Sequence, residues 1–244
     1  LDEGRHGLLQ TGQVFVAGNN LYIKSQEGVY KWHPGELAAN RIGDRLWIEG
    51  PTARDVFMAA CGEKTYAIDS QTQIIYLLEE SEKGLTSSTS WAFPSLSDDH
   101  QELPPYGIQG AAWADGKLWL LVFAVDSGEN ELWNFSLGES ALARQNAYDI
   151  LAITGFDEER LIVVQEDQDA AVMASIWETK SNTKEKAMTL DGANVFVPAL
   201  SIFYERQGER MFYSAQQSVV SIDMDGQNIE KYDVLGKPYS IAVI

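Results

Sequence analysis

The sequence contains a single cysteine, Cys61, among 244 residues, so no disulfide can form within the chain. This scarcity fits a cytosolic protein, and it equally fits a cell-surface protein of an organism that avoids disulfides. Cys61 ends the apolar run VFMAAC, which predicts a buried structural thiol rather than a nucleophile.

Long apolar runs are also missing. No stretch of 18 consecutive apolar residues occurs, so the sequence predicts no membrane-spanning segment. The chain opens on LDEGRHG without an initiator methionine, which indicates a trimmed or mature form from which any signal peptide has been removed.

Basic residues are scarce. Lys and Arg number 18 against 36 Asp and Glu, which gives a formal net charge of −18. A field of that sign repels phosphate backbones, so we predict no nucleic-acid partner. A protein or carbohydrate ligand stays open, provided that it is neutral or cationic.

Catalytic motifs are absent as well. The chain has three histidines and no His-Glu-x-x-His, Gly-x-Ser-x-Gly or phosphate-cradling glycine motif. His33 lies in a turn sequence, KWHPG, and the acid pairs Glu79–Glu80 and Glu158–Glu159 are expected to be solvated in connections. We therefore predict no catalytic residue, no metal site and no cofactor.

Strand-forming residues, in contrast, are abundant and recur in a pattern. An apolar strand, a polar turn, a second strand with aromatics, a hairpin and a third strand occur at 14–32, 56–78, 110–135, 150–177 and 200–223. If Leu21, Thr65, Leu118, Leu161 and Met211 are equivalent, the offsets between copies are 44, 53, 43 and 50 residues. Several strands in a repeat of this length are typical of β-propeller blades.

We therefore expect an all-β chain, a β-propeller of five full four-stranded blade repeats. Residues 41–50 are interpreted as the outer strand of the first blade, and 237–244 as the innermost strand of a sixth. That last strand either closes the ring or marks a chain cut from a longer multidomain protein. In both cases the hypothesis is one propeller domain over residues 1–244, with five to six blades.

The segment SIDMDGQN (221–228) poses a choice between a calcium loop and a hairpin turn. Asp223, Asp225 and Gly226 fit positions 3, 5 and 6 of an EF-hand loop, but Ser221 and Tyr232 occupy positions 1 and 12, which should be acidic. Strand-like sequences flank it. We therefore predict a turn between the third and fourth strands of a blade, without useful calcium affinity.

The longer stretch SVVSIDMDGQNIEK (218–231) resembles the hairpin of bacterial TolB-like and DUF5050-type repeat propellers. That resemblance implies a binding scaffold without common catalytic residues, in a bacterial cell-surface or extracellular setting that includes lipoproteins. The expected function is a non-catalytic binding module. The alternative is a carbohydrate-active propeller enzyme that uses two channel carboxylates, which the sequence does not identify.

The widest gap between copies contains the candidate contact surface, at 95–110. Its sequence SLSDDHQELPPYGIQG is not a strand pattern, and long connections are often functional or disordered. Within it, carboxylates, an imidazole and a phenol could bind a cationic or hydroxylated partner. The candidate binding residues are Asp98, Asp99, His100, Glu102 and Tyr106.

Overall fold

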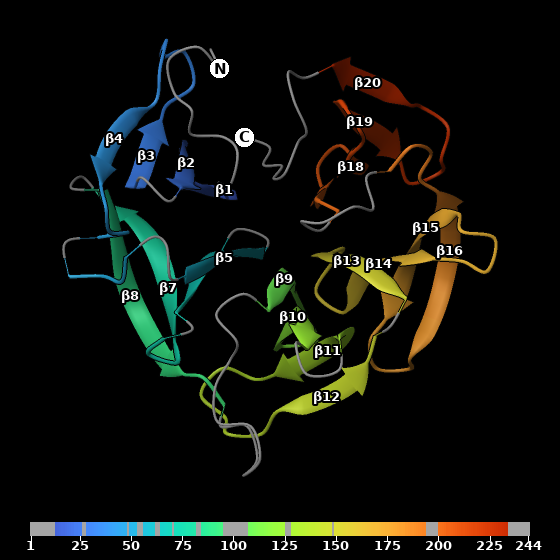
Figure 1. The fold of residues 1–244 in the computed structure, drawn as a ribbon, viewed down its shortest axis with the longest axis horizontal. Helices are drawn as coiled ribbons and strands as arrows, with labels where there is room; N and C mark the ends of the chain where they lie inside the picture. Colours follow the sequence, from blue (N-terminus) through green and yellow to red (C-terminus); the bar gives the residue numbers. More distant parts are fainter. Residues whose placement is uncertain are drawn as a thin grey trace. The chain divides into compact units, whose positions relative to one another are not determined.

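The computed structural model describes residues 13–25, 28–47, 49–52, 56–61, 64–69, 71–81, 84–94, 107–124, 128–147, 149–193 and 200–233. Within these ranges the chain forms twenty β-strands and no helix (Figure 1). The strands make five four-stranded antiparallel sheets, each in chain order, which are the blades of a five-bladed β-propeller. The prediction of an all-β propeller is confirmed. The described part of the chain therefore contains no helix that is long and apolar enough to cross a membrane.

The strands belong to two compact units, of which the first contains β1 to β8. The first blade consists of β1 (Gln13–Ala17), β2 (Asn20–Ser25), β3 (Gly28–Trp32) and β4 (Asn40–Gly43). The second consists of β5 (Val56–Cys61), β6 (Lys64–Asp69), β7 (Ile74–Ser81) and β8 (Gly84–Ala92).

The second unit contains three blades, β9 to β20. The third blade consists of β9 (Ile108–Ala114), β10 (Lys117–Ala124), β11 (Glu129–Phe135) and β12 (Ala143–Asn146). The fourth consists of β13 (Ile150–Gly155), β14 (Arg160–Glu166), β15 (Val172–Glu178) and β16 (Thr183–Thr189). The fifth consists of β17 (Ile202–Glu205), β18 (Arg210–Ser214), β19 (Ser218–Asp223) and β20 (Glu230–Asp233).

The repeat alignment made from the sequence is confirmed at single-residue level. The second residue of the second strand in each blade is Leu21, Thr65, Leu118, Leu161 or Met211. These are the positions taken as equivalent, and four of the five are apolar. The agreement follows from strand periodicity, since a slip of one residue would have placed each side chain on the opposite face of its sheet.

Two other expectations on strands can be compared with the structure. The predicted outer strand of the first blade exists as β4, but it covers Asn40–Gly43 and does not continue through residue 50. Beyond it, Arg45 forms only an isolated bridge with Thr52. The expected sixth innermost strand, 237–244, lies outside the described residues.

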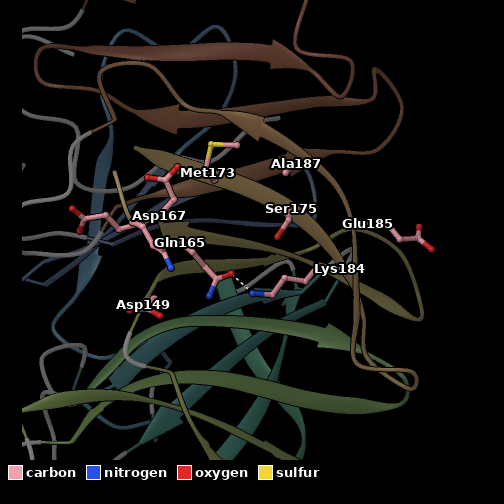
Figure 2. Close-up of a pocket in the computed structure, with 10 residues that line it drawn as sticks. Asp149, Gln165, Asp167, Met173, Ser175, Lys184, Glu185 and Ala187 are labelled. Carbon is pink, nitrogen blue, oxygen red and sulfur yellow. Dashed lines mark hydrogen bonds between the residues drawn. The ribbon is translucent and has the colours of Figure 1, made fainter. Parts of the chain in front are cut away.

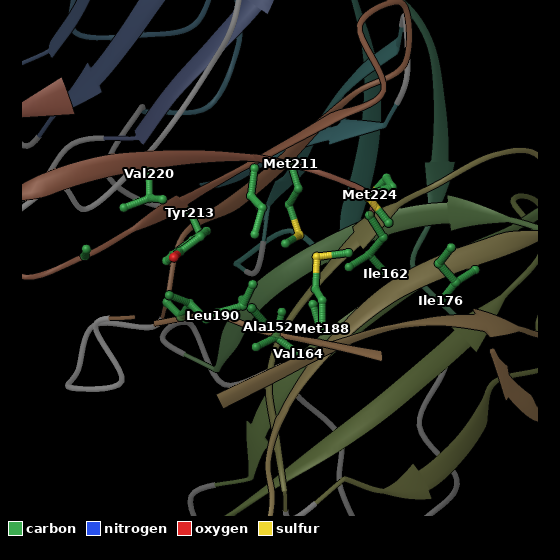
Figure 3. Packing of buried hydrophobic residues seen from close by; sticks show 14 residues of the cluster. Ala152, Ile162, Val164, Ile176, Met188, Leu190, Met211, Tyr213, Val220 and Met224 are labelled. Atoms are coloured by element: carbon green, nitrogen blue, oxygen red, sulfur yellow. The ribbon is translucent and has the colours of Figure 1, made fainter. Parts of the chain in front are cut away.

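Apolar side chains between neighbouring blades form the cores of both units. In the first unit, Phe15 and Tyr22 pack with Met58 and Leu78 of the second blade. In the second unit, one cluster joins the third and fourth blades and another joins the fourth and fifth. Figure 3 shows the latter, in which Met188 of β16 lies beside Met211 of β18.

A polar network also links the first two blades. The carboxylate of Glu80 on β7 accepts hydrogen bonds from Asn20 Nδ2 (2.5 Å) and Tyr22 Oη (2.7 Å), and pairs with Lys31 Nζ at 2.8 Å. The Glu80 side chain is 17% exposed. The expectation that Glu80 is a solvated acid in a connection is therefore wrong, whereas its neighbour Glu79 is exposed.

Gly18 leaves room for that carboxylate in the turn between β1 and β2. A Cβ added at Gly18 would lie 2.3 Å from Glu80 Oε2, and its φ of +58° falls in the left-handed region that favours glycine. The Asn19 backbone N–H in the same turn donates to Glu80 at 3.3 Å. The turn and the network therefore depend on each other.

The Asp-Gly segment is the predicted hairpin turn between β19 and β20. The Asp223 carboxylate accepts backbone N–H bonds from Asp225, Gln227 and Asn228, and these bonds lower its pKa. The Asn228 side chain donates to it as well, at 2.6 Å. Asp223 thus closes the turn locally, as Asp side chains commonly do. That the turn does not bind calcium stays a prediction.

Candidate functional site

The contact loop predicted from the sequence falls between β8 and β9 in the chain. Its residues Asp98, Asp99, His100, Glu102 and Tyr106 lie outside the described residues, so their role stays a prediction. Pro94, the last described residue before them, and Gly107, the first after them, bound the connection between β8 and β9.

Cys61 and His33 are described side chains whose types can take part in covalent or acid–base chemistry. Cys61 is buried, and burial raises the pKa of its thiol to about 12, so the thiolate form is suppressed near neutral pH. His33 is an exposed residue after β3 whose Nδ1 lies 3.0 Å from Asn20 Oδ1. Both expectations, a buried thiol and a turn histidine, are confirmed. Among the residues that the structure describes, no three His, Cys, Asp or Glu side chains are grouped to hold a metal.

The fourth blade carries an open groove of about 540 Å³. Its lining comes from β14, β15, β16 and the loops at one end of the blade (Figure 2). The lining residues are Asp149, Gln165, Glu166, Asp167, Gln168, Met173, Ser175, Lys184, Glu185 and Ala187. No aromatic side chain is among these described residues, which include four acidic residues and one lysine.

Strand alternation explains why the groove lies where it does. On β14, Leu161 and Val163 belong to the apolar cluster shared with the third blade, and the next side chain on that face is Gln165. On β15, opposite them, Trp177 is in the same cluster and is followed on its face by Ser175 and then Met173. The face is therefore apolar at one end of the blade and becomes a polar groove at the other.

Ser175 and Gln165 form the floor of the groove. Ser175 is 9% exposed as a residue, and its hydroxyl, which is not among the fully buried unpaired polar atoms, makes no hydrogen bond within the described part of the chain. Figure 2 shows that hydroxyl directed toward Gln165 and Lys184. Lys184 Nζ donates to Gln165 Oε1, which leaves the Gln165 amide nitrogen without an acceptor among the described residues. The floor thus presents a hydroxyl, an amide N–H group and an ammonium.

Three acidic residues of the lining, Asp149, Glu166 and Asp167, belong to the loop end of the blade. Ile150 pairs with Gln165, so the next residues outward, Asp149 and Glu166, stand opposite each other, and the Glu166 N–H donates to the Asp149 carbonyl at 3.2 Å. Asp167 follows directly and starts the β14–β15 loop. Its Oδ1 accepts the N–H groups of Asp169 (2.9 Å) and Ala171 (2.8 Å), which fixes the loop.

The opposite end of the groove is held by an ion pair. Glu185 Oε2 lies 3.7 Å from Arg160 Nη1, and Arg160 in turn bonds Asp157. Partial burial raises the pKa of Asp157, but the hydrogen bonds from Arg160 and from two backbone N–H groups outweigh burial and leave it below its ordinary value. The Arg160 guanidinium thus pairs with both Asp157 and Glu185, and its charge is neutralised by them.

Sequence reasoning missed this groove. The available indication was the interruption of two apolar runs, by Gln165 after LIVV and by Ser175 within VMASIW. A polar residue in a strand is commonly a solvated one, and only the pairing of β14 with β15 brings these two side chains to one face.

No family model matches the chain, and no curated protein matches its sequence. Solved structures with a similar fold include a putative TolB from Agrobacterium tumefaciens, at 11% identity and a TM-score of 0.54 over 94% of this chain and 84% of that one. The SapL1 lectin, solved with α-methyl fucoside, has 13% identity and a TM-score of 0.52 over 94% and 82%.

The WD40 domain of Toxoplasma gondii coronin has 10% identity and a TM-score of 0.50, over 88% of this chain. This chain spans 55% of the length of that structure. At such low identities a likeness establishes architecture and not a shared ligand. The comparisons therefore agree with the strand pairing: this chain has the fold of the bacterial and eukaryotic β-propellers.

Proposed function

We propose that this propeller is a non-catalytic binding module and that the groove on the fourth blade is its ligand site. The observation that carries the proposal is an open groove whose floor presents two polar side chains, Ser175 and Gln165, between apolar strands. Within the described part of the chain the Ser175 hydroxyl makes no hydrogen bond, so it can bond a ligand that enters the groove.

The groove chemistry favours binding over turnover. A serine nucleophile needs a base within hydrogen-bond reach, and the nearby Lys184 donates to Gln165 instead. Neither histidine nor cysteine lines the groove in the described part of the chain. The similar SapL1 structure, a lectin with a bound fucoside, supports a propeller as a scaffold for ligand sites.

The first test fills the groove from its exposed side. Ala187 is exposed on the outer strand β16, so Ala187→Tyr should obstruct the groove at little cost to folding. With ¹⁵N-labelled protein, we expect methyl glycosides or acetylated, amidated tripeptides to shift amide resonances of residues 165–175. The variant should reduce these shifts by roughly tenfold or more in apparent affinity.

Ala143→Tyr is the matched control, since Ala143 is exposed on the outer strand of the third blade. It should bind as the wild type does. Shifts that Ala187→Tyr leaves intact, or no shift in the groove with either probe class, would contradict the proposal. Hydrolysis of nitrophenyl glycosides that Asp149→Asn abolishes would contradict the non-catalytic role and favour the carbohydrate-active alternative.

We extend the proposal to a bacterial cell-surface or extracellular setting, as a TolB-like or DUF5050-type propeller. The Asp-Gly hairpin at 218–231 and the similar TolB structure support this extension. In intact cells that produce the protein, we expect added protease to digest it while a cytosolic marker survives. Complete protection until the cells are lysed would place the protein inside the cell.

A further inference from the structure

We propose that Asp191–Gly192, in the turn after β16, is a site of spontaneous backbone rearrangement to isoaspartate, which the other Asp-Gly pairs of the chain resist. Those other pairs are Asp115–Gly116 and Asp225–Gly226. The modification lies outside the groove and is independent of the proposed function. It affects the junction between the fourth and fifth blades.

The rearrangement needs only an aspartic acid and the backbone nitrogen that follows it. The nitrogen attacks Cγ of the aspartic acid, a C–N bond forms, and the nitrogen's proton leaves with the carboxyl hydroxyl as water. The product is a five-membered succinimide ring. Water then adds to one of the two ring carbonyls and opens the ring to aspartate or to isoaspartate. A following glycine favours the attack, because it has no Cβ to hinder the approach of its nitrogen.

Both reacting groups are unrestrained at Asp191–Gly192. The turn is closed by the Ala193 N–H, which donates to the Leu190 carbonyl at 3.2 Å, so the Gly192 N–H takes no part in closing it. Neither that N–H nor the Asp191 carboxylate has a hydrogen bond or an ion pair within the described ranges. Both residues are exposed. The nitrogen and the carboxyl group can therefore meet without first leaving a partner.

At Asp225–Gly226 the attacking nitrogen is occupied. The Gly226 N–H donates to the Asp223 carbonyl at 2.9 Å, within the turn that the Asp223 carboxylate also closes. This bond must break before the nitrogen can attack, and the loss of one hydrogen bond slows a reaction by roughly threefold or more.

At Asp115–Gly116 the carboxyl group is occupied. The Asp115 carboxylate pairs with Lys180 Nζ at 3.2 Å, and its backbone N–H donates to the Glu158 carbonyl at 2.6 Å. The carboxyl group reacts in its neutral form, so it must take up a proton and leave the ammonium first. An ion pair of this exposure is expected to slow the reaction by roughly threefold.

Isoaspartate at residue 191 would disturb the core between the fourth and fifth blades. The hydroxyl of Tyr213, a side chain of that core, donates to the Asp191 carbonyl at 3.1 Å. In isoaspartate this carbonyl becomes a free carboxylate, and the backbone continues through the former side chain with one additional carbon. Leu190 precedes it and lies beside Tyr213 in the same cluster (Figure 3). The rearranged chain therefore places a new charge and a longer backbone against this cluster.

The test follows all three pairs in one sample. The full chain is kept at neutral pH for several weeks, digested and mapped by electron-transfer fragmentation, which distinguishes isoaspartate from aspartate. We expect isoaspartate to accumulate at residue 191 at least roughly threefold faster than at residues 115 and 225. Asp191→Glu should abolish the product there, since glutamate would have to close a six-membered ring, and should leave the other two pairs unchanged.

Lys180→Ala tests whether the restraints set the reactivity. It frees the Asp115 carboxylate and should raise isoaspartate at residue 115 by roughly threefold, with residue 191 unchanged. The matched control Lys64→Ala removes an exposed lysine of the first unit and should alter none of the three pairs. Aged wild-type protein should also show a second unfolding transition at lower denaturant, which aged Asp191→Glu lacks.

Several results would overturn the proposal. These are equal accumulation at the three pairs, a faster reaction at residue 115 or 225 than at residue 191, and no isoaspartate at all. A level at residue 115 that Lys180→Ala leaves unchanged would show that the partners do not protect. Identical unfolding of aged and fresh protein, with isoaspartate present at residue 191, would contradict the effect on the core.

Discussion

Replacing Glu80 with alanine should lower the free energy of unfolding of the first unit by about 2 kcal/mol, since three donors lose a partly buried carboxylate that they share. The variant leaves the Lys31 ammonium, the Tyr22 hydroxyl and the Asn20 amide without their common acceptor. Denaturant unfolding followed by fluorescence gives the free energy, and hydrogen exchange of β2 and β7 locates the change.

The same carboxylate predicts how stability depends on pH. Partial burial raises the pKa of Glu80, but the hydrogen bonds from Lys31, Tyr22 and Asn20 outweigh it and leave the pKa below its ordinary 4.5. A folded-state pKa below the unfolded one adds stability that is complete above pH 4.5 and is lost as pH falls through the folded value. Glu80→Gln should remove this contribution at neutral pH.

Glu79→Ala is the control for Glu80→Ala. Glu79 is the exposed neighbour of Glu80 on β7, so its replacement should change the unfolding free energy by less than about 0.5 kcal/mol. If Glu80→Ala also lowered the unfolding free energy by less than about 0.5 kcal/mol, the Glu80 network would contribute no stability. The interpretation of the first two blades as joined through Glu80 would then be wrong.

Trp119→Ala should lower the stability of the second unit by about 3–5 kcal/mol, the usual range for removal of a large buried aromatic side chain. Trp119 is 6% exposed, its ring packs edge-on against Trp177 of the fourth blade at 5.6 Å, and its Nε1 donates to the Ala114 carbonyl at 3.1 Å. The cavity would open between two blades. Thermal and denaturant unfolding measure the loss.

A second variant, Trp119→Phe, separates the contribution of ring packing from that of the indole hydrogen bond. Trp119→Phe keeps an aromatic ring beside Trp177 but lacks the indole N–H, so we expect a smaller loss of about 1–2 kcal/mol. Equal losses for alanine and phenylalanine would assign the effect to the hydrogen bond. A loss below about 1 kcal/mol for alanine would show that the ring does not pack as described.

The blade repeat was predictable from the sequence because strand periodicity and turn residues are local properties. Leu21 and its four counterparts fell in the same strand position for this reason. The stretch ESALARQNAYDI (139–150) has a short apolar spacing close to that of a helix, yet it contains β12 at Ala143–Asn146. Sheet pairing thus prevailed over a weak local preference for helix.

The groove and the Glu80 network were not predictable, because both depend on pairing between strands. Ser175 shares a face with Gln165 through the register of β14 with β15, in which Ser175 pairs with Val163 and Gln165 with Met173, and Glu80 meets Lys31 across two blades. Neither neighbour is close in sequence, and an acid pair or a lone serine in a strand is most often solvated. Without the register, a polar residue in a strand gives no indication of whether it faces water, a partner or a ligand.

The connectivity of the sheets has a consequence for synthesis. In the described chain every strand of a blade pairs with the strand next to it in sequence. A blade can therefore complete its backbone hydrogen bonds as soon as its repeat has left the ribosome, because no distant segment is required. Its apolar faces, however, stay uncovered until the next blade arrives. Nascent chains are thus most exposed to aggregation between one blade and the next, and repulsion between acidic chains opposes their association during that interval.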